Sequence, residues 1–407
     1  MRYDLIIVGG GLVGAGFAAA LHSSGLRIAL VDARLPSNDD PRLFALNASS
    51  CQFLANLGYW PALAPHASPI QQVHVSHQGH FGAVRLHHHD VNLPELGHVV
   101  PARYIEAALN DAMETLPHVD LYRPARLKTL TQTETDAEVI LETSDGEVKL
   151  QSSIVIGADG TASTVRTLVN IPVNTVDYEQ CAMVTRVALR RAHQQIAYER
   201  FYRHGAIAML PLPGMECASI WSTTKKEAQR LSALPDDIYL SELQKLFGFR
   251  LGRLQSVQKR HVFPLQMMRA ERTHDRSVLL LGNSAHTLHP IAAQGFNLAL
   301  YEAAVLVEGM LEKLDRSESV SAADLHAMLL KSRQQLTVSV NVSHWLSQLF
   351  SNDSAPANWL LSLGMTGFNA ATPIKNKFIR MMTGRSGRVP SLLMRLHENE
   401  KHDATAS

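Results

Sequence analysis

Three glycines near the start of the chain have the spacing that a bound dinucleotide requires. The motif Gly9-x-Gly11-x-x-Gly14 directly follows the apolar run 3–8, and small and apolar residues continue over 15–21. In a strand–turn–helix unit, the first glycine permits the tight turn and the second lets the backbone approach a pyrophosphate, while the third lets the helix pack closely on the strand. The order of these pieces predicts a dinucleotide site. A glycine-rich turn that binds nothing is the alternative.

A carboxylate further along narrows the choice of dinucleotide. The run 27–31 predicts a second strand, and Asp32 stands directly after it. A carboxylate at this place can accept hydrogen bonds from both ribose hydroxyls and disfavours a 2′-phosphate. These residues therefore predict an unphosphorylated adenosine cofactor and leave NAD and FAD both open.

A loop late in the chain could hold a ring system. Residues 277–281 predict a buried strand that is ended by Gly282 and Asn283, and a helix is expected from near Gln294, after a small-residue segment that ends in Gly295. Backbone N–H groups at such a helix start suit an electron-rich or anionic ring. An ordinary strand–loop–helix crossover would have the same pattern.

Two further polar residues have both a functional and a structural interpretation. Asp159 follows the apolar run 153–157 and precedes Gly160 and a new helix, so it could bind a ligand or simply cap that helix. Arg42 follows a polar turn and could equally be a surface charge.

Composition limits the remaining functions. The 407 residues are 46% hydrophobic and 18% charged, which is typical of a globular protein, and the net charge of +1 argues against nucleic acid as a partner. The three dispersed cysteines form no C-x-x-C pair, which fits a reducing compartment. Histidines in the run 87–90 would point to opposite faces of a strand, so we assign no metal. No uninterrupted apolar stretch reaches about 18 residues, and a cytoplasmic protein is expected.

The elements expected to position these groups are of two kinds. Strands alternate with helices around the glycine loops, whereas 171–265 is dominated by strands and predicts a separate sheet. The expected strands outside the loops already described are 71–76, 82–86, 137–142, 147–150, 182–189, 196–202, 207–211 and 217–222, and the expected helices are 49–57, 104–116, 238–246, 300–311, 323–350 and 359–396.

Taken in order, the motifs resemble those of a known enzyme family. The chain is similar to the single-component aromatic flavin monooxygenases with the p-hydroxybenzoate hydroxylase fold. Within them it looks most like the ubiquinone-biosynthesis hydroxylases, and in particular like those that act on a 2-polyprenyl-6-methoxyphenol. The matching motifs are Gly9-x-Gly11-x-x-Gly14, Arg42, Gly157-Ala158-Asp159-Gly160 with Arg166, Glu199-Arg200-Phe201, Ala208-Met209-Leu210-Pro211 and Gly282-Asn283 through Gly295.

The resemblance covers nearly the whole chain and implies a mixed α/β fold. It implies a Rossmann-like FAD-binding domain, an inserted antiparallel-sheet substrate domain and C-terminal helices. The expected boundaries are 1–70, 96–170 and 268–335 for the FAD-binding domain, 71–95 and 171–267 for the substrate-binding sheet domain, and 336–407 for the C-terminal helical region.

The family's contacts to the adenosine half of FAD map onto residues of this chain. By resemblance, Asp32 would hold the adenosine ribose, and Gly11 and Gly14 would let the pyrophosphate approach. Arg42 and Arg103 match family positions near the ribityl and pyrophosphate groups.

The contacts to the flavin half map in the same way. Asp159 would support the pyrophosphate indirectly and help nicotinamide binding. Gly282-Asn283 matches the pair that bonds the ribityl chain, and Pro290 and Gly295 would lie beside the isoalloxazine.

Three residues depart from the family pattern. Asn283 and Glu302 each replace an Asp, and Ala293 stands where Gly is common. The amide oxygen of Asn283 can still accept a hydroxyl proton, without the assistance of a charge. Ala293 allows fewer backbone conformations than Gly would in the segment just before Gln294-Gly295, which would lie beside the isoalloxazine.

The resemblance also implies a reaction. NAD(P)H would reduce FAD, O2 would add to the ring, and the flavin C4a-hydroperoxide would transfer oxygen to a polyprenylated methoxyphenol. The chain would then hold the ring, exclude water and favour the phenolate. His204, His289 and Tyr202 lie in elements expected near the ring, but a structural role is favoured for each, so the catalytic residue is left unknown.

The C-terminal segment allows two interpretations. Residues 373–397 hold six basic residues and no acidic one, with apolar side chains between them. Such a segment can lie on an anionic membrane surface at the inner face, or pack as a helix with a solvated side.

Partners and alternative functions also follow from the family. The expected partners are the polyprenyl phenol, O2 and other ubiquinone-biosynthesis proteins. Three alternatives stay open: a sister hydroxylase that acts at another ring position, a reductase on the same scaffold, and a flavin-bearing structural subunit, which the substitutions Asn283 and Ala293 keep open.

Overall fold

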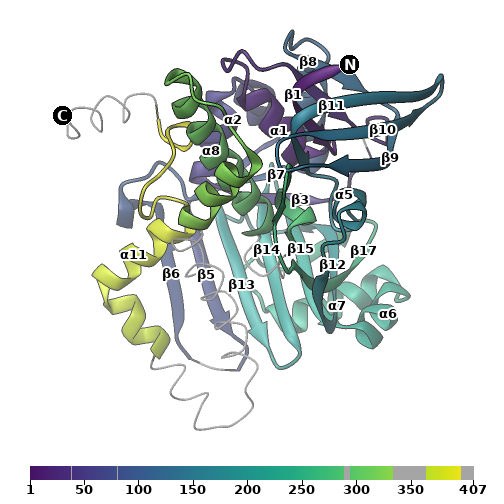
Figure 1. The fold of residues 1–407 in the computed structure, drawn as a ribbon. Coiled ribbons are helices and arrows are strands. Elements are labelled where there is room, and N and C mark those ends of the chain that lie inside the picture. Colours follow the sequence, from purple (N-terminus) through teal and green to yellow (C-terminus); the bar gives the residue numbers. More distant parts are fainter. Residues whose placement is uncertain (38, 80, 288–293, 333–363, 396–407) are drawn as a thin grey trace.

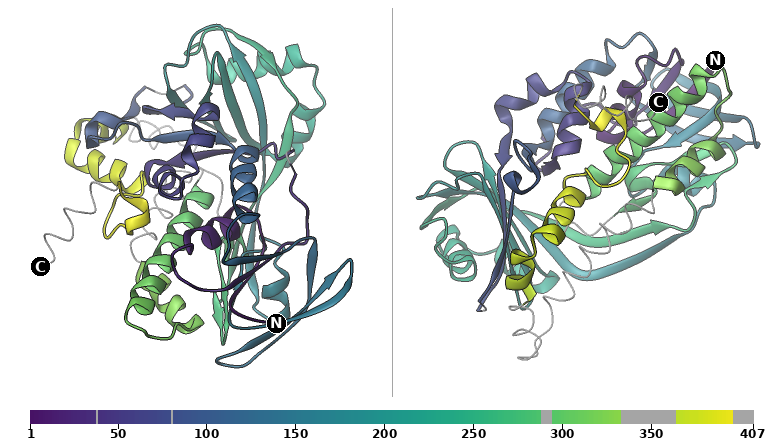
Figure 2. Two further views of the ribbon diagram at one scale, coloured as in Figure 1. Left: turned by 90° about the horizontal axis from the view of Figure 1, so that it is seen from above. Right: turned by 90° about the vertical axis from the view of Figure 1, so that its left-hand side faces the viewer.

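The computed structural model describes residues 1–37, 39–79, 81–287, 294–332 and 364–395 (Figure 1). It confirms the mixed α/β fold. One sheet contains the amino-terminal strand, and a second, larger sheet lies beside it (Figures 1 and 2).

The amino-terminal sheet is built around a buried parallel core. β1 (Arg2–Val8) pairs in parallel with β11 (Gly146–Gly157) on one side and with β2 (Ile28–Val31) on the other. β19 (Val278–Leu280) continues the core beyond β11, and β8 (Val119–Tyr122) continues it beyond β2. Because parallel strands end at the same edge of a sheet, the loops that follow β1, β2, β11 and β19 meet there. These are the loops that carry the predicted cofactor residues.

One strand of this sheet is longer than the sequence predicted. β11 is continuous over 12 residues, whereas separate strands were expected at 147–150 and 153–157. Its first half pairs antiparallel with β10 (Ala137–Thr143), which also pairs with β9 (Ala125–Gln132), and its second half pairs in parallel with β1. The polar residues Gln151 and Ser152 between the halves stay in the strand because both pair with β1 on one side and with β10 on the other. The hydroxyl of the buried Ser152 donates to the carbonyl of Ile154 at 2.7 Å.

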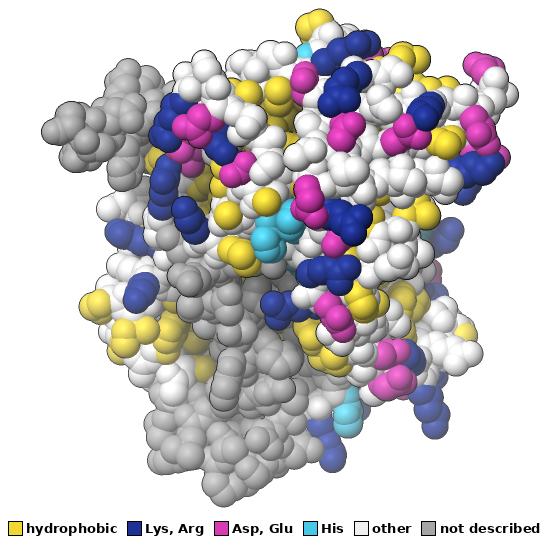
Figure 3. Space-filling view, viewed as in Figure 1, with side chains coloured by type: hydrophobic (Ala, Val, Ile, Leu, Met, Phe, Trp, Pro, Cys, Tyr) yellow, Lys and Arg dark blue, Asp and Glu magenta, His cyan; other side chains and the backbone are white. Residues whose placement is uncertain are grey.

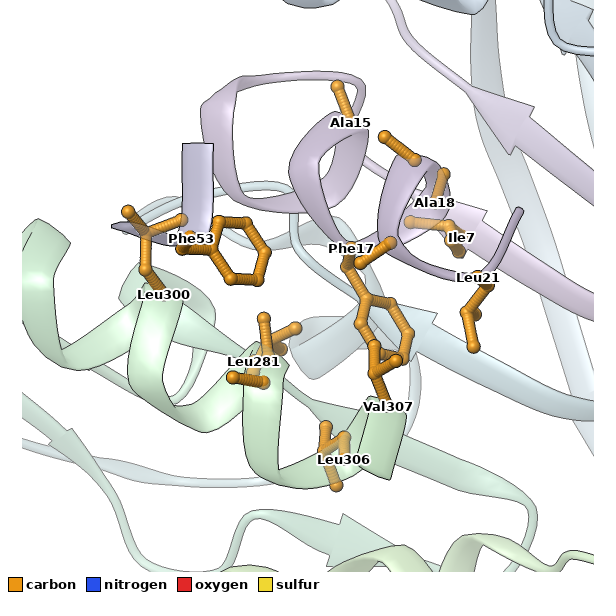
Figure 4. Packing of buried hydrophobic residues seen from close by; sticks show 14 of the residues in the cluster. Ile7, Ala15, Phe17, Ala18, Leu21, Phe53, Leu281, Leu300, Leu306 and Val307 are labelled. Carbon is orange, nitrogen blue, oxygen red and sulfur yellow. The ribbon is translucent and has the colours of Figure 1, made fainter. Parts of the chain in front are cut away.

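Helices cover one face of the amino-terminal sheet. α1 (Leu12–Ala20) packs against both α4 (Ala102–Met113) and α8 (Gln294–Asp315), and the three helices share one buried apolar cluster. Figure 4 shows Phe17 of α1 lying against Val307 of α8, and both side chains are fully buried. This packing fixes the amino end of α1 relative to the start of α8.

The second sheet has nine strands in the described part of the chain. Its order brings two early strands, β5 and β6, to the edge of a late set, because β5 pairs in parallel with β13. The strands are β20 (His286–Thr287), β17 (His261–Ala270), β12 (Val173–Leu189), β15 (Glu216–Thr224), β14 (Gly205–Leu212), β13 (Ile196–Tyr202), β5 (Gln72–His77) and β6 (Ala83–His87), with β16 (Leu254–Val257) beside β12.

The two faces of this sheet pack against different parts of the molecule. The outer face packs under α6 (Lys225–Ser232) and α7 (Asp236–Phe247) and buries Met183 and Trp221. The inner face, which carries Ala182, Val184, Ala208 and Ile220, is turned the other way because side chains alternate along a strand. The sequence predicted α7 but not α6, whose mostly polar residues bury only two side chains.

The remaining elements connect the two sheets. β3 (Leu43–Asn47), β7 (Gly97–Pro101) and β4 (Ser68–Ile70) form a small sheet, and α2 (Ala48–Asn56) follows β3 directly, close to the expected 49–57. The side chain of Asn47 caps α2 by accepting from the amide of Ser50 at 2.9 Å.

The C-terminal prediction was partly wrong. The expected helix at 323–350 lies largely outside the described residues, and 322–332 is helical. The helical tail expected over 359–396 is helical at 364–370 and in α11 (Thr372–Met382). α11 ends before Gly384 and Gly387, both of which have positive φ, and only the short turn η5 (Ser391–Leu393) follows in the described part. The domain boundaries expected from the sequence stay a prediction.

Candidate active site

A cavity of about 1030 Å³ lies between the strand ends of the amino-terminal sheet and the inner face of the second sheet. Its size is at the upper end of the ~300–1,000 Å³ that small-molecule and cofactor sites commonly have. The predicted cofactor residues that line it are Gly9, Gly11, Asp32, Arg42, Asp159, Asn283 and Gly295.

The glycine loop is shaped for close backbone approach. Gly9 has φ +109°, and a Cβ there would overlap the backbone of Ala158. A Cβ at Gly14 would overlap the carbonyl of Gly9, so this glycine serves helix packing and does not line the cavity. Gly11 begins α1 without a side-chain cap, and a Cβ there would meet no atom of the chain within 4 Å. The first turn of α1 therefore opens onto the cavity through bare backbone.

Asp32 keeps part of its carboxylate free. One oxygen accepts from the backbone amide of Arg34 at 2.9 Å, which fixes the side chain after β2. The other oxygen lies next to Gly10, where a Cβ would come within 2.9 Å of it, and has no hydrogen-bond donor among the described residues. That oxygen is available to a ligand in the cavity.

Arg42 lies in the cavity wall but is paired with acids in this structure. Its guanidinium donates to Asp40 at 2.5–2.9 Å and lies 3.5 Å from Glu106. Burial alone would raise the pKa of Asp40, but the hydrogen bonds from Arg42 hold it below its usual value. Burial, together with the charge of Asp40, raises the pKa of Glu106. A bound phosphate would compete with these carboxylates for Arg42.

Asp159 caps a helix through one carboxylate oxygen and leaves the other without a partner among the described residues. Its Oδ2 accepts from the amides of Thr164 and Val165 at 2.6 and 3.1 Å, at the start of a short helix, α5 (Thr164–Leu168). Its Oδ1 is buried and lacks a partner within the described residues. An oxygen of this kind is costly to leave unpaired, so a ligand or water that donates to it is favoured.

Arg166 ties two cavity loops together. It is buried and donates to the carbonyl of Ser284 at 2.9 Å and to that of Thr161 at 2.8 Å. The hydroxyl of Ser284 in turn accepts from the amide of Leu281 and donates to the carbonyl of Gly157. These bonds hold the loop after β19 against the loop after β11.

The loop after β19 turns one polar side chain toward the cavity. Gly282 has φ +62° and lies behind the lining, where a Cβ would be 3.3 Å from Val13. Asn283 is exposed, and its amide has no hydrogen bond among the residues that the structure describes. Gly295 lines the cavity at the start of α8.

Besides Gly14 and Gly282, two further predicted cofactor residues are not among the described residues that line the cavity. Arg103 is in the first turn of α4, where its guanidinium stacks over Tyr104 at 4.7 Å and does not line the cavity. Pro290 lies outside the described residues.

The sequence did not identify the far wall of the cavity. This wall is apolar and comes from the inner face of the second sheet. On the opposite, near side of the cavity, the rings of Phe44 and Phe296 pack together with their centroids 4.7 Å apart. No local motif marks these residues, and only their alternation along strands could have suggested them. The far-wall residues are Ala182, Val184, Ile220, Phe263 and Leu265.

The side chains considered for the phenol proton do not gather at this wall. Tyr202 is buried on the outer face, where its hydroxyl donates to the carbonyl of Ser222 and accepts from the indole N–H of Trp221, each at 2.9 Å. His204 is exposed in the turn between β13 and β14, and His289 lies outside the described residues.

The histidine run has structural contacts. His88 bonds the carbonyl of Leu93 at 2.6 Å, and Asp90 accepts from the amide of His87 and pairs with Lys375 at 3.0 Å. Within the described residues, no group of three His, Cys, Asp or Glu side chains could hold a metal ion.

Comparison with known families gives one match over most of the chain. The family model described as "FAD binding domain" matches residues 2–327. The ubiquinone hydroxylase UbiL of Rhodospirillum rubrum is 32% identical over 405 residues, which cover 96% of this chain and 92% of that protein. The 3-demethoxyubiquinol 3-hydroxylase of Escherichia coli is 28% identical over 396 residues, covering 94% and 98%.

Solved structures share the fold. The p-nitrophenol 4-monooxygenase PnpA of Pseudomonas putida superposes with a TM-score of 0.77 at 14% identity, covering 95% of this chain and all of that one. PqsL of Pseudomonas aeruginosa, described as a probable FAD-dependent monooxygenase, gives 0.73 at 20% identity, covering 90% and 100%. At these identities the likeness establishes the arrangement of the elements alone.

Proposed function

This chain belongs to the FAD-binding family of flavin-dependent hydroxylases, and on that premise we propose that it hydroxylates a polyprenylated methoxyphenol in ubiquinone biosynthesis. NAD(P)H is the proposed electron donor. The names of the relatives support the pathway, and the shape of the cavity supports the class of substrate.

The observation that carries the proposal is the two-sided character of the cavity. Its near side offers bare backbone at Gly11, which fits the phosphates of FAD, and oxygens on Asp32 and Asp159 that have no partner among the described residues, which fit its hydroxyls. Its far side offers apolar side chains such as Val184 and Ile220, which fit a prenylated ring. A cavity that served only a dinucleotide would not need this second, apolar wall.

FAD, when bound, would activate O2, and one oxygen atom of that O2 would enter the ring. The residues of the chain would do the remaining work. Asp32 would accept from the ribose hydroxyls, and the amide of Asn283 would meet the ribityl chain. Phe44 and Phe296, together with the inner face, would exclude water from the reacting centre.

The test uses the purified full-length chain. We expect a flavin absorption spectrum, its bleaching by NADH or NADPH without oxygen, and one atom of ¹⁸O from ¹⁸O2 in the product from a short-chain 2-prenyl-6-methoxyphenol. Reduction and re-oxidation without labelled product would favour the reductase. A protein that binds no added FAD would contradict the assignment of the glycine loop.

A glycine variant separates cofactor binding from folding. In Gly11→Val the new Cβ would meet no atom of the protein within 4 Å, but the side chain would project into the cavity. We therefore expect normal thermal stability without added FAD and loss of FAD binding.

The position of the new hydroxyl, read by NMR of the product, distinguishes this enzyme from a sister hydroxylase. A structural subunit would retain FAD weakly and form no product.

We also propose that the C-terminal segment contacts an anionic membrane, where such a substrate would reside. α11 leaves Ile374 62% exposed beside the exposed Lys377 and Arg380, and hydrophobic side chains gather over α11 in Figure 3. Not all of the basic residues are available, because Lys375 is buried and paired with Asp90. Among the described residues, no helix has the length and apolar character needed to cross a bilayer.

Vesicle sedimentation tests this contact. Lys377→Glu combined with Arg380→Glu should weaken binding to vesicles that contain anionic phospholipid, because each basic residue near such a surface contributes ~1 kcal/mol to the free energy of binding. Lys226→Glu combined with Lys245→Glu, which reverses two exposed charges on α6 and α7, is the matched control. Equal binding of both variants would contradict the proposal.

A further inference from the structure

One ionisable side chain stands in the middle of the inner face and has no role in the site described so far. Glu199 is on β13, directly opposite Ala208 on β14 and Val75 on β5. Ala208 is opposite Ile220, which lines the cavity and is itself opposite Val184. Directly paired residues project from the same face of a sheet, so Glu199 shares the face that forms the far wall.

The distance along this face is short. Glu199 and Ile220 are separated by one intervening strand, so their backbones lie about 10 Å apart at the usual strand spacing of ~4.8 Å. Glu199 does not itself line the cavity, so a phenol ring against Ile220 would reach it only with its hydroxyl directed along the inner face, across Ala208. Tyr198 and Arg200, the neighbours of Glu199 in the sequence, point to the outer face.

The surroundings of Glu199 are apolar. Val75, Ala208 and Phe201 belong to the apolar clusters of the inner face, which Met365, Phe378 and Ile379 complete from the C-terminal segment. Glu199 is partly buried, and the structure gives its carboxyl no hydrogen bond or ion pair among the described residues. A carboxyl placed in this way needs a polar partner, and none of its described neighbours supplies one.

The other ionisable groups around this face are engaged or distant. His77 on β5 bonds the carbonyl of Gln78 at 2.9 Å, and Arg186 and Glu216 pair with each other at 3.9 Å near the strand ends. His261 lies opposite Val184 at the far side of the face, and Lys375 on α11 is held by Asp90. Burial without a compensating charge raises the pKa of Glu199 to about 7.

We propose that Glu199 is the catalytic base that accepts the phenol proton of the substrate. The inference rests on the proposed function. The substrate hydroxyl would donate a hydrogen bond to the carboxylate; its O–H bond then breaks, the proton passes to Glu199, and the electron pair stays on the phenolate oxygen. Electron density on the ring rises where oxygen is to be added. A base poised near the working pH is effective in such a transfer.

The first test measures binding, not turnover. Wild-type protein should bind a short-chain 2-prenyl-6-methoxyphenol about 10- to 100-fold more tightly than the methyl ether of the same phenol at pH 8, because the ether has no proton to donate to the carboxylate. The preference should shrink as the pH falls below about 7, where the carboxyl becomes protonated. A wild-type protein that binds phenol and ether equally at every pH would overturn the inference without any variant.

The second test uses a matched pair of variants. Glu199→Gln should reduce the preference to a few-fold, remove its pH dependence and lower the rate of hydroxylation by about 10²- to 10⁴-fold while FAD binding is retained. Glu216→Gln, which changes an acid of the same sheet near its end, should behave as wild type. A Glu199→Gln protein with wild-type preference and rate would contradict the assignment.

The two proposals can fail separately. If wild-type protein hydroxylates the phenol and Glu199→Gln does so equally well, only the assignment of Glu199 fails. If Glu199 controls the binding of the phenol but no oxygen from O2 enters any product, the binding role stands and the hydroxylase function fails.

Discussion

Replacing Glu199 by Gln should stabilise the protein, and by an amount that depends on pH. The pKa of Glu199 is raised from 4.5 to about 7 because burial penalises the charged carboxylate. The folded state therefore binds a proton more tightly than the unfolded state. The stability associated with this proton is fully present below about pH 4.5 and is lost as the pH rises through about 7. Gln carries no such proton and should not show this loss.

The size of the effect follows from the shift. One pKa unit corresponds to ~1.4 kcal/mol, so most of a shift of about 2.5 units would be expressed between pH 5 and pH 8. Because the side chain is only partly buried, water screens part of this cost, and we expect about 1–2.5 kcal/mol. For a chain of 407 residues, with an unfolding entropy of ~2.1 cal/mol/K per residue, this is about 1–3 °C in melting temperature.

The assay is thermal unfolding of wild type, Glu199→Gln and Glu216→Gln at pH 5 and pH 8, with FAD held at one saturating concentration. The difference between Glu199→Gln and wild type should grow with pH, whereas that between Glu216→Gln and wild type should stay constant. Comparing variants at each pH removes the contribution of all other titrating groups. An equal difference at both pH values for Glu199→Gln would refute the placement of a partly buried carboxyl without a partner among the described residues of the inner face.

Three further predictions concern other parts of the molecule. Gly9→Ala should lower both the melting temperature and the FAD content, because its Cβ would overlap Ala158 at a backbone φ of +109°; a stable yellow protein would contradict this. Asp32→Ala should weaken FAD binding about 10- to 100-fold in a fluorescence titration while stability without FAD is unchanged, since a charge-assisted bond to the ribose is lost. Trp221→Phe should cost about 1–3 kcal/mol in urea unfolding, because the hydroxyl of Tyr202 on the outer face loses the hydrogen bond that the indole donates and keeps only its own bond to Ser222, and unchanged stability would count against the bond from the indole.

The cofactor loops could be predicted from the sequence because their signals are local. Each glycine or acid in them directly follows an apolar strand, and the carboxyl ends of parallel strands meet at one edge of a sheet whatever the rest of the chain does. The strand at the amino terminus and the strand before Asp32 were predicted within a residue or two of their observed bounds. Arg103 was transferred from a family pattern, and the structure places it against Tyr104, away from the cavity.

Other features depended on contacts between distant parts of the chain. β11 is one strand because β10 and β1 pair with its two halves, and a local pattern interrupted by polar residues could not show that. α6 carries too few apolar residues to be recognised, yet its buried side chains help to cover a sheet already formed by distant strands.

The inner face shows the same division most clearly. From the sequence alone, the alternation in 196–202 separates Glu199 from Tyr202, but it does not say which set is turned toward the cofactor. The tertiary structure decides this, because α6 and α7 cover the face of Tyr202 and leave the face of Glu199 to the cavity side. The sequence by itself indicated a dinucleotide with an unphosphorylated adenosine, since such a site needs only short motifs at strand ends, and the family match selects FAD over NAD. The tertiary structure decided which side chains line the apolar wall of the cavity, since a wall built from several strands exists only after those strands have paired.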